Sequence, residues 1–206
     1  MNNYFVILAA GKGKRFNKNK PKQFHQYKNR EVVEHSIIKS VESKLFKKIV
    51  VVTNNFNQFK GKKYLKFIKI IKGGKERSDS SLKALKYLKR YNPLNVFIHD
   101  AARPNFSMKL LKKISKNLKK NKAVVPVIKS KDSIKYKIKS QIFNLDKKNS
   151  ILTQTPQAFR FKELYKLACK EKDNLSDEAT LFLNQNHKIK FIPGEYQNNK
   201  ITYMGD

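Results

Sequence analysis

Short apolar runs alternate along the chain with longer segments in which apolar residues recur every three or four positions. The runs are typical of strands buried on both faces of a sheet, and the spaced segments are typical of amphipathic helices. We predict strands at residues 5–8, 49–52, 67–71, 96–98 and 123–127. Because strands and helices alternate, the pattern predicts βαβ units around a mainly parallel sheet.

Two of the predicted helices begin at a serine. Ser107 and Ser78 each precede apolar residues that repeat on one helical face, namely Leu110, Leu111, Ile114 and Leu118 after the first and Leu82, Leu85 and Leu88 after the second. Serine is a favoured N-cap because its hydroxyl accepts a hydrogen bond from a free amide of the first turn. We therefore expect a helix to start after each serine.

Residues 131–145 follow a different pattern, in which apolar residues alternate with lysines. The apolar positions of the first half are Ile134, Tyr136 and Ile138, and the lysines are Lys135, Lys137 and Lys139. A period of two predicts two short strands. A two-stranded ribbon has too little core to be stable alone, so we expect residues 131–147 to protrude as an arm that packs on a second subunit of a homodimer.

Length and composition narrow the class of protein. A chain of 206 residues with 39% hydrophobic residues suits one buried core, so we predict a single domain over residues 1–206. No apolar run reaches the roughly 18 residues that span a bilayer, and the N-terminus does not read as a signal peptide. We therefore expect a cytoplasmic protein with no membrane partner. Cys169 is the only cysteine, which excludes a disulfide within the chain.

The formal net charge of +32 raises nucleic-acid binding as an alternative function, since lysine and arginine release counterions from a phosphate backbone. The lysines are spread over every segment, however, and Lys83, Lys86 and Lys89 alternate with the leucines of one predicted helix. That arrangement is typical of solvated helix faces. Asn, Ile and Phe share AT-rich codons with Lys and are also abundant, so genome composition explains the charge better. We expect no specific nucleic-acid partner.

The first predicted strand runs into a glycine loop that carries cations. Gly11 and Gly13 let backbone amides approach an anion closely, and Arg15 supplies positive charge beside them. Lys22 follows behind the rigid Pro21. The spacing of the glycines matches neither a Rossmann fingerprint nor a P-loop. On the residues alone the loop is a candidate cradle for a polyphosphate, and the alternative is a basic surface turn.

A second cluster, HDAARP at residues 99–104, follows the fourth predicted strand. In open α/β sheets, ligands bind at the carboxyl ends of the strands. Asp100 offers the hard oxygen ligand that Mg²⁺ prefers, and the alternative is an ion pair with Arg103 that fixes a turn. We expect His99 to be a packed residue rather than a catalytic base, because no nearby serine or cysteine requires one.

These clusters belong to a longer set of motifs. In chain order the set is LAAGKGKR with PKQF, GGKERSDS, HDAARP, KDSIK, QTPQAF, SDEAT and NKIT. Together they resemble the 2-C-methyl-D-erythritol 4-phosphate cytidylyltransferases of isoprenoid biosynthesis, and the resemblance covers almost the whole chain. Ribitol 5-phosphate cytidylyltransferases are similar but tend to have a glycine pair where Ala9 and Ala10 stand. The motifs therefore favour methylerythritol phosphate over ribitol phosphate as the acceptor.

The resemblance implies a three-layer α/β fold of the Rossmann-like nucleotidyltransferase kind, with a protruding hairpin arm, and a Mg²⁺-dependent reaction with CTP. It assigns catalytic roles to Arg15, Lys22 and Lys200, and contacts with CTP to Ala9, Ala10, Gly11, Gly13, Gly74 and Ser80. It assigns the sugar phosphate to Arg103, Ser133, Lys147 and Thr155, and the metal to Asp100. Ser133 and Lys147 stand where the family usually has a threonine and an arginine that reach over from the partner subunit. Lysine keeps the charge at position 147 but loses the bidentate fork of arginine.

The implied reaction needs no general base. A phosphomonoester has a second pKa of about 6 and is mostly dianionic at neutral pH. The protein then has to align two polyanions and neutralise the charge that develops between them. This accounts for the absence of a Ser/His/Asp or Cys/His constellation from the sequence.

Overall fold

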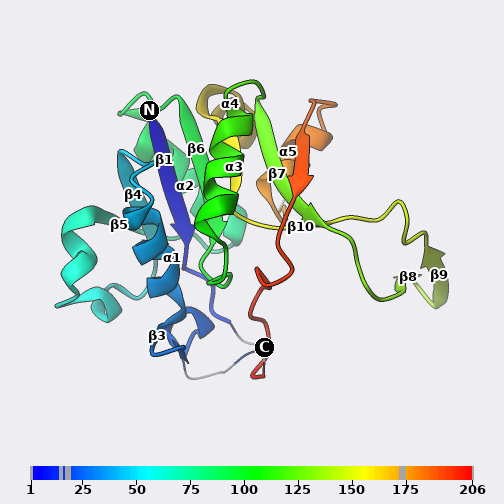
Figure 1. The fold of residues 1–206 in the computed structure, drawn as a ribbon, viewed down its shortest axis with the longest axis horizontal. Helices are drawn as coiled ribbons and strands as arrows, with labels where there is room; N and C mark the ends of the chain where they lie inside the picture. Colours follow the sequence, from blue (N-terminus) through cyan, green and yellow to red (C-terminus); the bar gives the residue numbers. More distant parts are fainter. Residues whose placement is uncertain (1, 14–15, 17–19, 172–174, 206) are drawn as a thin grey trace.

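The computed structural model describes residues 2–13, 16, 20–171 and 175–205. An eight-stranded sheet forms its centre, with the strand order β10-β7-β11-β6-β1-β4-β5 and with β12 added to β7 (Figure 1). The strands are β1 (Asn3–Leu8), β4 (Lys48–Thr53), β5 (Ile68–Lys72), β6 (Asn95–Asp100), β7 (Ala123–Ile128), β10 (Leu152–Thr153), β11 (Gln157–Arg160) and β12 (Lys190–Pro193). β1 pairs in parallel with both β4 and β6, whereas β11 runs antiparallel to β6 and β7. The mainly parallel sheet is confirmed.

Helices cover both faces of the sheet and complete the predicted three layers. They are α1 (Val32–Glu42), α2 (Arg77–Lys89), α3 (Met108–Leu118), α4 (Phe161–Lys170) and α5 (Glu178–Leu183). Helices α1 and α3 pack on one face, and α2, α4 and α5 pack on the other. Short 3-10 turns, η1 (Lys22–Phe24), η2 (Phe56–Phe59) and η3 (Lys63–Phe67), and the small strands β2 (Gln26–Tyr27) and β3 (Arg30–Glu31) occupy the connections.

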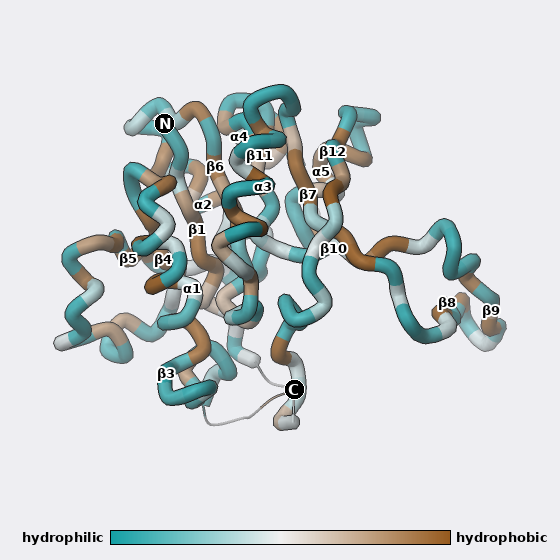
Figure 2. The backbone as a smooth tube through the Cα atoms, viewed as in Figure 1, coloured by the Kyte–Doolittle hydropathy of each residue, from teal (hydrophilic) through white to brown (hydrophobic). Residues whose placement is uncertain are grey.

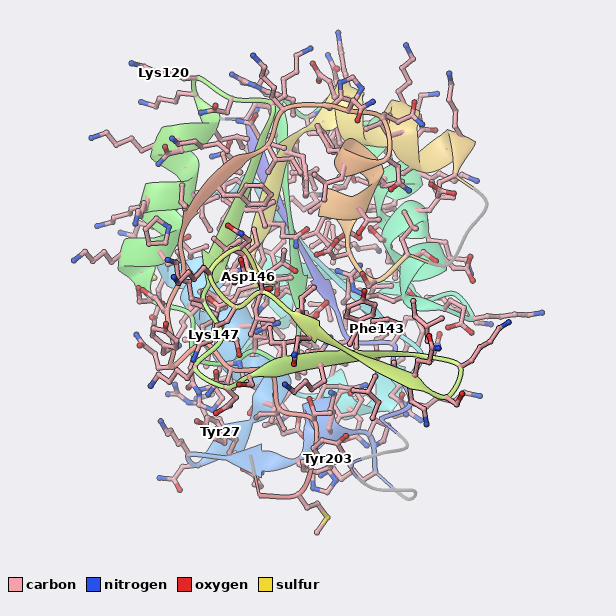
Figure 3. All side chains as sticks on the ribbon, turned by 90° about the vertical axis from the view of Figure 1, so that its right-hand side faces the viewer. Tyr27, Lys120, Phe143, Asp146, Lys147 and Tyr203 are labelled. Atoms are coloured by element: carbon pink, nitrogen blue, oxygen red, sulfur yellow. The ribbon has the colours of Figure 1, made fainter. Side chains whose placement is uncertain are left out.

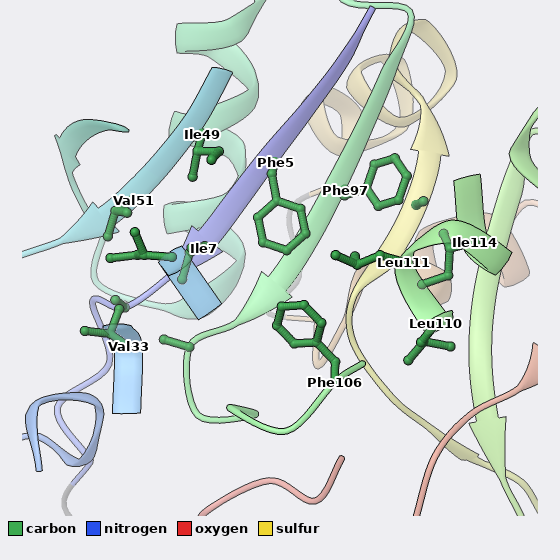
Figure 4. Packing of buried hydrophobic residues seen from close by; sticks show 14 of the residues in the cluster. Phe5, Ile7, Val33, Ile49, Val51, Phe97, Phe106, Leu110, Leu111 and Ile114 are labelled. Atoms are coloured by element: carbon green, nitrogen blue, oxygen red, sulfur yellow. The ribbon is translucent and has the colours of Figure 1, made fainter. Parts of the chain in front are cut away.

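The two cores follow from the alternation of side chains along β1. Phe5 and Ile7 face α1 and α3, while Tyr4 and Val6 face the opposite helices. Figure 4 shows Phe5 beside Phe97 and Phe106, beneath the apolar face of α3. The central strands are mostly hydrophobic, whereas the helices change from hydrophobic to hydrophilic around their circumference (Figure 2). Strands buried on both faces therefore appear in the sequence as continuous apolar runs.

The predicted boundaries need two corrections. Four predicted strands are found with one or two extra residues at their ends, but the strand expected at 67–71 is β5 at Ile68–Lys72. Ser107 does cap α3, because its Oγ accepts a hydrogen bond from the Leu110 amide at 3.0 Å. Ser78, in contrast, lies inside α2, which Glu76 caps instead. Glu76 and Asp79 each accept a hydrogen bond from the other's backbone amide, and this reciprocal box starts the helix before the serine.

Strands β8 (Ile134–Ile138) and β9 (Gln141–Leu145) form the expected antiparallel hairpin, separate from the main sheet. The hairpin extends away from the body of the protein (Figure 1). Tyr136 and Phe143 stack across it with ring centroids 5.2 Å apart, yet both stay exposed.

Seen from the side of the hairpin, nitrogen-tipped side chains project around the outline of the protein (Figure 3). In the part of the chain that is described, no helix is both long and apolar enough to cross a membrane.

Candidate active site

A cavity of ≈ 500 Å³ lies at the carboxyl ends of β1 and β6, which are parallel neighbours in the sheet. Its lining comes from the glycine loop after β1, η1, the start of α2, the turn after β6 and the C-terminal segment. Eight of the residues assigned from the sequence line it, namely Ala10, Gly11, Gly13, Lys22, Gly74, Ser80, Asp100 and Lys200. The fold thus brings motifs from both ends of the chain to the edge of the sheet where ligands bind.

The glycine loop is shaped by close contacts at its base. Gly13 has φ of +62°, a conformation that L side chains rarely adopt, and a Cβ there would lie 3.1 Å from the Lys22 amide nitrogen. Ala9 is buried beneath the loop and does not line the cavity, and its amide continues the sheet by donating to Val52 O at 2.8 Å. A Cβ added to Gly11 would meet nothing within 4 Å, so Gly11 borders open space.

The start of α2 closes a second side of the cavity. The Gly74 amide donates to Ser80 Oγ at 3.0 Å, and Ser80 Oγ in turn donates to Glu76 O at 3.0 Å. A Cβ on Gly74 would lie 2.2 Å from the Cβ of Asp79. Glycine is therefore required where the chain turns into the helix, and the hydroxyl of Ser80 holds that turn in place.

Positive charge dominates the lining. The cationic side chains are those of Lys12, Lys22, Lys75, Arg77 and Lys200, and the carboxylates are those of Glu76 and Asp100. Lys22 Nζ donates to Ile201 O at 2.6 Å, and Lys200 Nζ donates to Asp100 Oδ2 at 2.8 Å. These two bonds attach the C-terminal segment to both sides of the cavity. A cavity with this surplus of cations suits a polyanionic ligand.

Asp100, the last residue of β6, lies between two cations. Its Oδ1 accepts from Arg77 Nε at 3.0 Å and its Oδ2 accepts from Lys200. Burial by itself would raise the pKa of Asp100, but the charges of Arg77 and Lys200 outweigh burial and hold this pKa far below its ordinary value. Arg77 also donates from both Nη atoms to the carboxylate of Glu178, at 2.9 Å each. The carboxylate of Asp100 is therefore ionised and held in a fixed orientation.

His99 is packed, as its sequence context predicts. It is fully buried, with Nε2 3.0 Å from Ser36 Oγ and Nδ1 3.1 Å from Thr155 Oγ1. Burial lowers its pKa to about 3, so the ring is neutral at physiological pH. Thr155 Oγ1 also accepts from the Asp100 amide at 3.0 Å. Thr155 thus lies behind Asp100 and outside the cavity lining.

Arg103 does not form the ion pair with Asp100 that the sequence left open. Its Nη1 donates to Asn198 O at 2.9 Å and its Nη2 donates to Thr153 O at 3.3 Å. The guanidinium therefore joins the C-terminal segment to the end of β10, behind the cavity lining. Arg77 and Lys200 take the place beside Asp100 because their side chains enter from the cavity side.

The remaining assigned residues lie elsewhere. Ser133 precedes β8 on the arm, and Lys147 follows β9, where its Nζ donates to Lys131 O. Neither lines the cavity. Figure 3 shows Lys147 at the base of the hairpin and Phe143 along it. Arg15, assigned to the triphosphate, lies outside the described residues.

Sequence reasoning missed Arg77 and Glu178, although both lie within motifs that it singled out. Arg77 is in GGKERSDS and Glu178 is in SDEAT. The available signal for Arg77 was its position directly before Ser78, the serine expected to start a helix. For Glu178 it was an acid within a motif already used for the resemblance. Lys12 and Lys75 also line the cavity and were not assigned.

Comparison with known proteins places the chain in a family. A family model for IspD, 2-C-methyl-D-erythritol 4-phosphate cytidylyltransferase, matches residues 4–206. The chain is 47% identical to the bifunctional enzyme IspD/IspF of Pelagibacter ubique, over 100% of this chain and 56% of the relative. It is 35% identical to the 2-C-methyl-D-erythritol 4-phosphate cytidylyltransferase of Thermosipho africanus, over 98% of this chain and 93% of the relative.

Comparison with solved structures points to the same family. The bifunctional IspDF of Campylobacter jejuni superposes with a TM-score of 0.84 at 29% identity, covering 98% of this chain and 52% of that structure. The chain thus spans about half the length of the two bifunctional proteins and nearly all of the Thermosipho enzyme. With the motifs, the cavity and the family model in agreement, this chain belongs to the 2-C-methyl-D-erythritol 4-phosphate cytidylyltransferase family.

Proposed function

We propose that this chain transfers CMP from CTP to 2-C-methyl-D-erythritol 4-phosphate. A phosphate oxygen of the acceptor attacks the α-phosphorus of CTP, the bond from that phosphorus to the β-phosphate bridging oxygen breaks, and pyrophosphate leaves. The observation that carries the proposal is the meeting of Lys22, Lys200 and Asp100 in one cavity beside the glycine loop. No observation favours ribitol phosphate or a nucleic acid over this pair of substrates.

The site provides charge and alignment rather than a base. The acceptor phosphate is mostly dianionic at neutral pH, so no proton has to be removed from it. His99 has the neutral ring that a base requires, but it is fully buried and outside the lining. Lys22 and Lys200, together with Arg15, would neutralise the two polyanions and the charge that develops on the leaving group.

Asp100 is the residue that would hold Mg²⁺. The described residues contain no group of three or more His, Cys, Asp or Glu side chains that could bind a metal ion. An ionised carboxylate on the cavity wall fits Mg²⁺ nevertheless, because this ion is usually held by one or two carboxylates plus substrate phosphates. When bound, the ion would neutralise phosphate charge. Lys200 is the neighbour best able to give up its bond to Asp100, since its side chain is 40% exposed.

We further propose that the protein is a homodimer built through residues 131–147 of a single domain that spans residues 1–206. The arm exposes a set of large apolar side chains that includes Tyr136, Ile138, Ile142, Phe143 and Leu145. A symmetric partner would cover them. Ser133 and Lys147 lie away from the cavity of their own chain, which supports a contribution to the partner's site.

A pyrophosphate-release assay tests the reaction. The purified protein is given CTP, Mg²⁺ and a panel of phosphorylated polyols that includes methylerythritol phosphate and ribitol 5-phosphate, and each reaction is repeated with ATP, GTP and UTP. We expect release with CTP and methylerythritol phosphate. Faster release with ribitol 5-phosphate would reassign the acceptor, equal rates with ATP would indicate a generic nucleotidyltransferase, and no release with any pair would overturn the proposal.

A further inference from the structure

The side chain of Gln23 joins the glycine loop to η1 by two hydrogen bonds. The residue is 3% exposed, and its Nε2 donates to both Ala9 O and Gly11 O at 2.8 Å. Both hydrogens of the amide group are thereby used. Gln23 directly follows Lys22, so one short turn of η1 carries both a cavity cation and this double contact.

The two bonds determine which way the loop amides point. In a trans peptide the C=O of one residue and the N–H of the next lie on opposite sides of the bond. Because Gln23 binds the carbonyls of Ala9 and Gly11, the N–H groups of Ala10 and Lys12 are turned away from it. Neither N–H donates to any acceptor among the described residues, and both residues line the cavity.

We propose that Gln23 is a positioning residue for the triphosphate of CTP. By holding two carbonyls back, it presents the amides of Ala10 and Lys12 to phosphate oxygens and keeps carbonyl oxygens from facing the same anion. Backbone amides gathered in this way bind anions without any side-chain charge. The inference rests on the proposed function, since it takes CTP as the ligand.

Two substitutions separate the hydrogen bonds from the packing. Gln23→Met keeps the length of the side chain and removes both donors. Gln23→Glu keeps the shape but brings carboxylate oxygens against the two carbonyls, so it should be the more damaging change. Ser40→Ala is a matched control, because Ser40 is buried and its Oγ donates to the Ile37 carbonyl at 2.7 Å, within α1 and outside the cavity.

The experiment compares KM for CTP, Ki for pyrophosphate, KM for methylerythritol phosphate and Tm in each variant. We expect Gln23→Met to raise KM for CTP and Ki for pyrophosphate by about tenfold or more, with KM for the sugar phosphate within about twofold of wild type. Ser40→Ala should lower Tm and leave all three constants unchanged. If Gln23→Met lowers Tm while KM for CTP stays at the wild-type value, Gln23 is a structural residue and the inference is wrong.

Direct titration of CTP into each protein by calorimetry keeps the inference separate from the proposed reaction. A wild-type protein that binds CTP but releases no pyrophosphate would overturn the reaction and still permit the comparison of Kd between variants. Should Gln23→Met fail to fold, Gln23→Asn retains the amide but is too short to reach both carbonyls. A Kd for CTP that is unchanged in a folded Gln23→Asn variant would equally contradict the inference.

Discussion

Glu178 binds Arg77 through two parallel hydrogen bonds of 2.9 Å, from Nη1 to Oε1 and from Nη2 to Oε2. The two residues are 101 positions apart and lie at the first positions of α5 and α2. The third nitrogen of the guanidinium, Nε, donates to Asp100 Oδ1 at 3.0 Å. A carboxylate on one helix therefore orients the arginine that orients the cavity carboxylate.

Glu178→Gln should be costly because it removes one partner of a buried ion pair. We expect the free energy of unfolding, measured by urea denaturation, to fall by about 3 kcal/mol. Glu163→Gln is the control, since Glu163 Oε1 lies 3.7 Å from Nζ of the exposed Lys122. Removing the charge of Glu163 should lower the free energy of unfolding by less than about 0.5 kcal/mol. Equal effects of the two substitutions would show that the pair contributes little to stability.

Two glycines of the site should respond differently to alanine. A Cβ on Gly74 would lie 2.2 Å from the Asp79 Cβ, so Gly74→Ala should lower the free energy of unfolding by about 1–3 kcal/mol. Gly11→Ala meets no protein atom within 4 Å and should fold normally. Its methyl group would instead occupy space beside the ligand, and we expect KM for CTP to rise by about tenfold. A stable Gly11→Ala protein with unchanged KM would place CTP elsewhere.

Lys22→Ala should lower kcat by about 100-fold or more, because it removes a cation aimed at charge that develops in the transition state. Arg15→Ala is expected to act in the same way. The fold should survive the loss of the bond from Lys22 Nζ to Ile201 O, since one partly buried hydrogen bond contributes only about 1 kcal/mol. Lys116→Ala, on the exposed face of α3, is the control for loss of charge. Near-normal kcat in a folded Lys22→Ala protein would refute its catalytic role.

Deletion of the arm should uncouple dimerisation from CTP binding. Replacing residues 131–147 with a short Gly/Ser bridge removes β8 and β9, which pair only with each other among the described strands. We expect a monomer in sedimentation velocity that binds CTP with wild-type Kd but barely turns over methylerythritol phosphate. A deletion variant that remains dimeric, or an active monomer, would show that the arm is neither the interface nor part of the partner's site.

The lowered pKa of His99 predicts that the folded protein loses stability in acid. The unfolded chain binds a proton at this histidine below pH 6.5, but the folded protein does so only near pH 3, so the unfolded state gains protons as the pH falls between these values. From pH 7 to pH 5 this contributes about 2 kcal/mol of destabilisation. The depressed pKa of Asp100 acts in the same direction below about pH 4. In His99→Gln the difference in stability between pH 7 and pH 5 should shrink by about 2 kcal/mol, and an unchanged difference would mean that another group is responsible.

Much of the fold was predictable because the burial of a strand or helix determines which of its own residues are apolar. Strands such as β1 and β7 are covered on both faces and are apolar over most of their length, so they stand out as apolar runs in the sequence. The cap of α3 was readable from Ser107 alone, since the bond that it accepts lies three residues away. The cap of α2 was predicted wrongly. Serine is a preferred N-cap, so Ser78 was chosen, whereas Glu76 and Asp79 together form the cap.

The sequence by itself singled out the glycine loop, Lys22 and Asp100, because their residue types suit contact with phosphate or metal, and the family resemblance added Lys200. Only the tertiary structure decided which charges meet. It placed Arg77 and Lys200, rather than Arg103, beside Asp100, and Glu178 behind Arg77. The partners in such pairs are distant in the chain, and which of several nearby cations satisfies a buried carboxylate depends on the paths of the strands and helices that carry them.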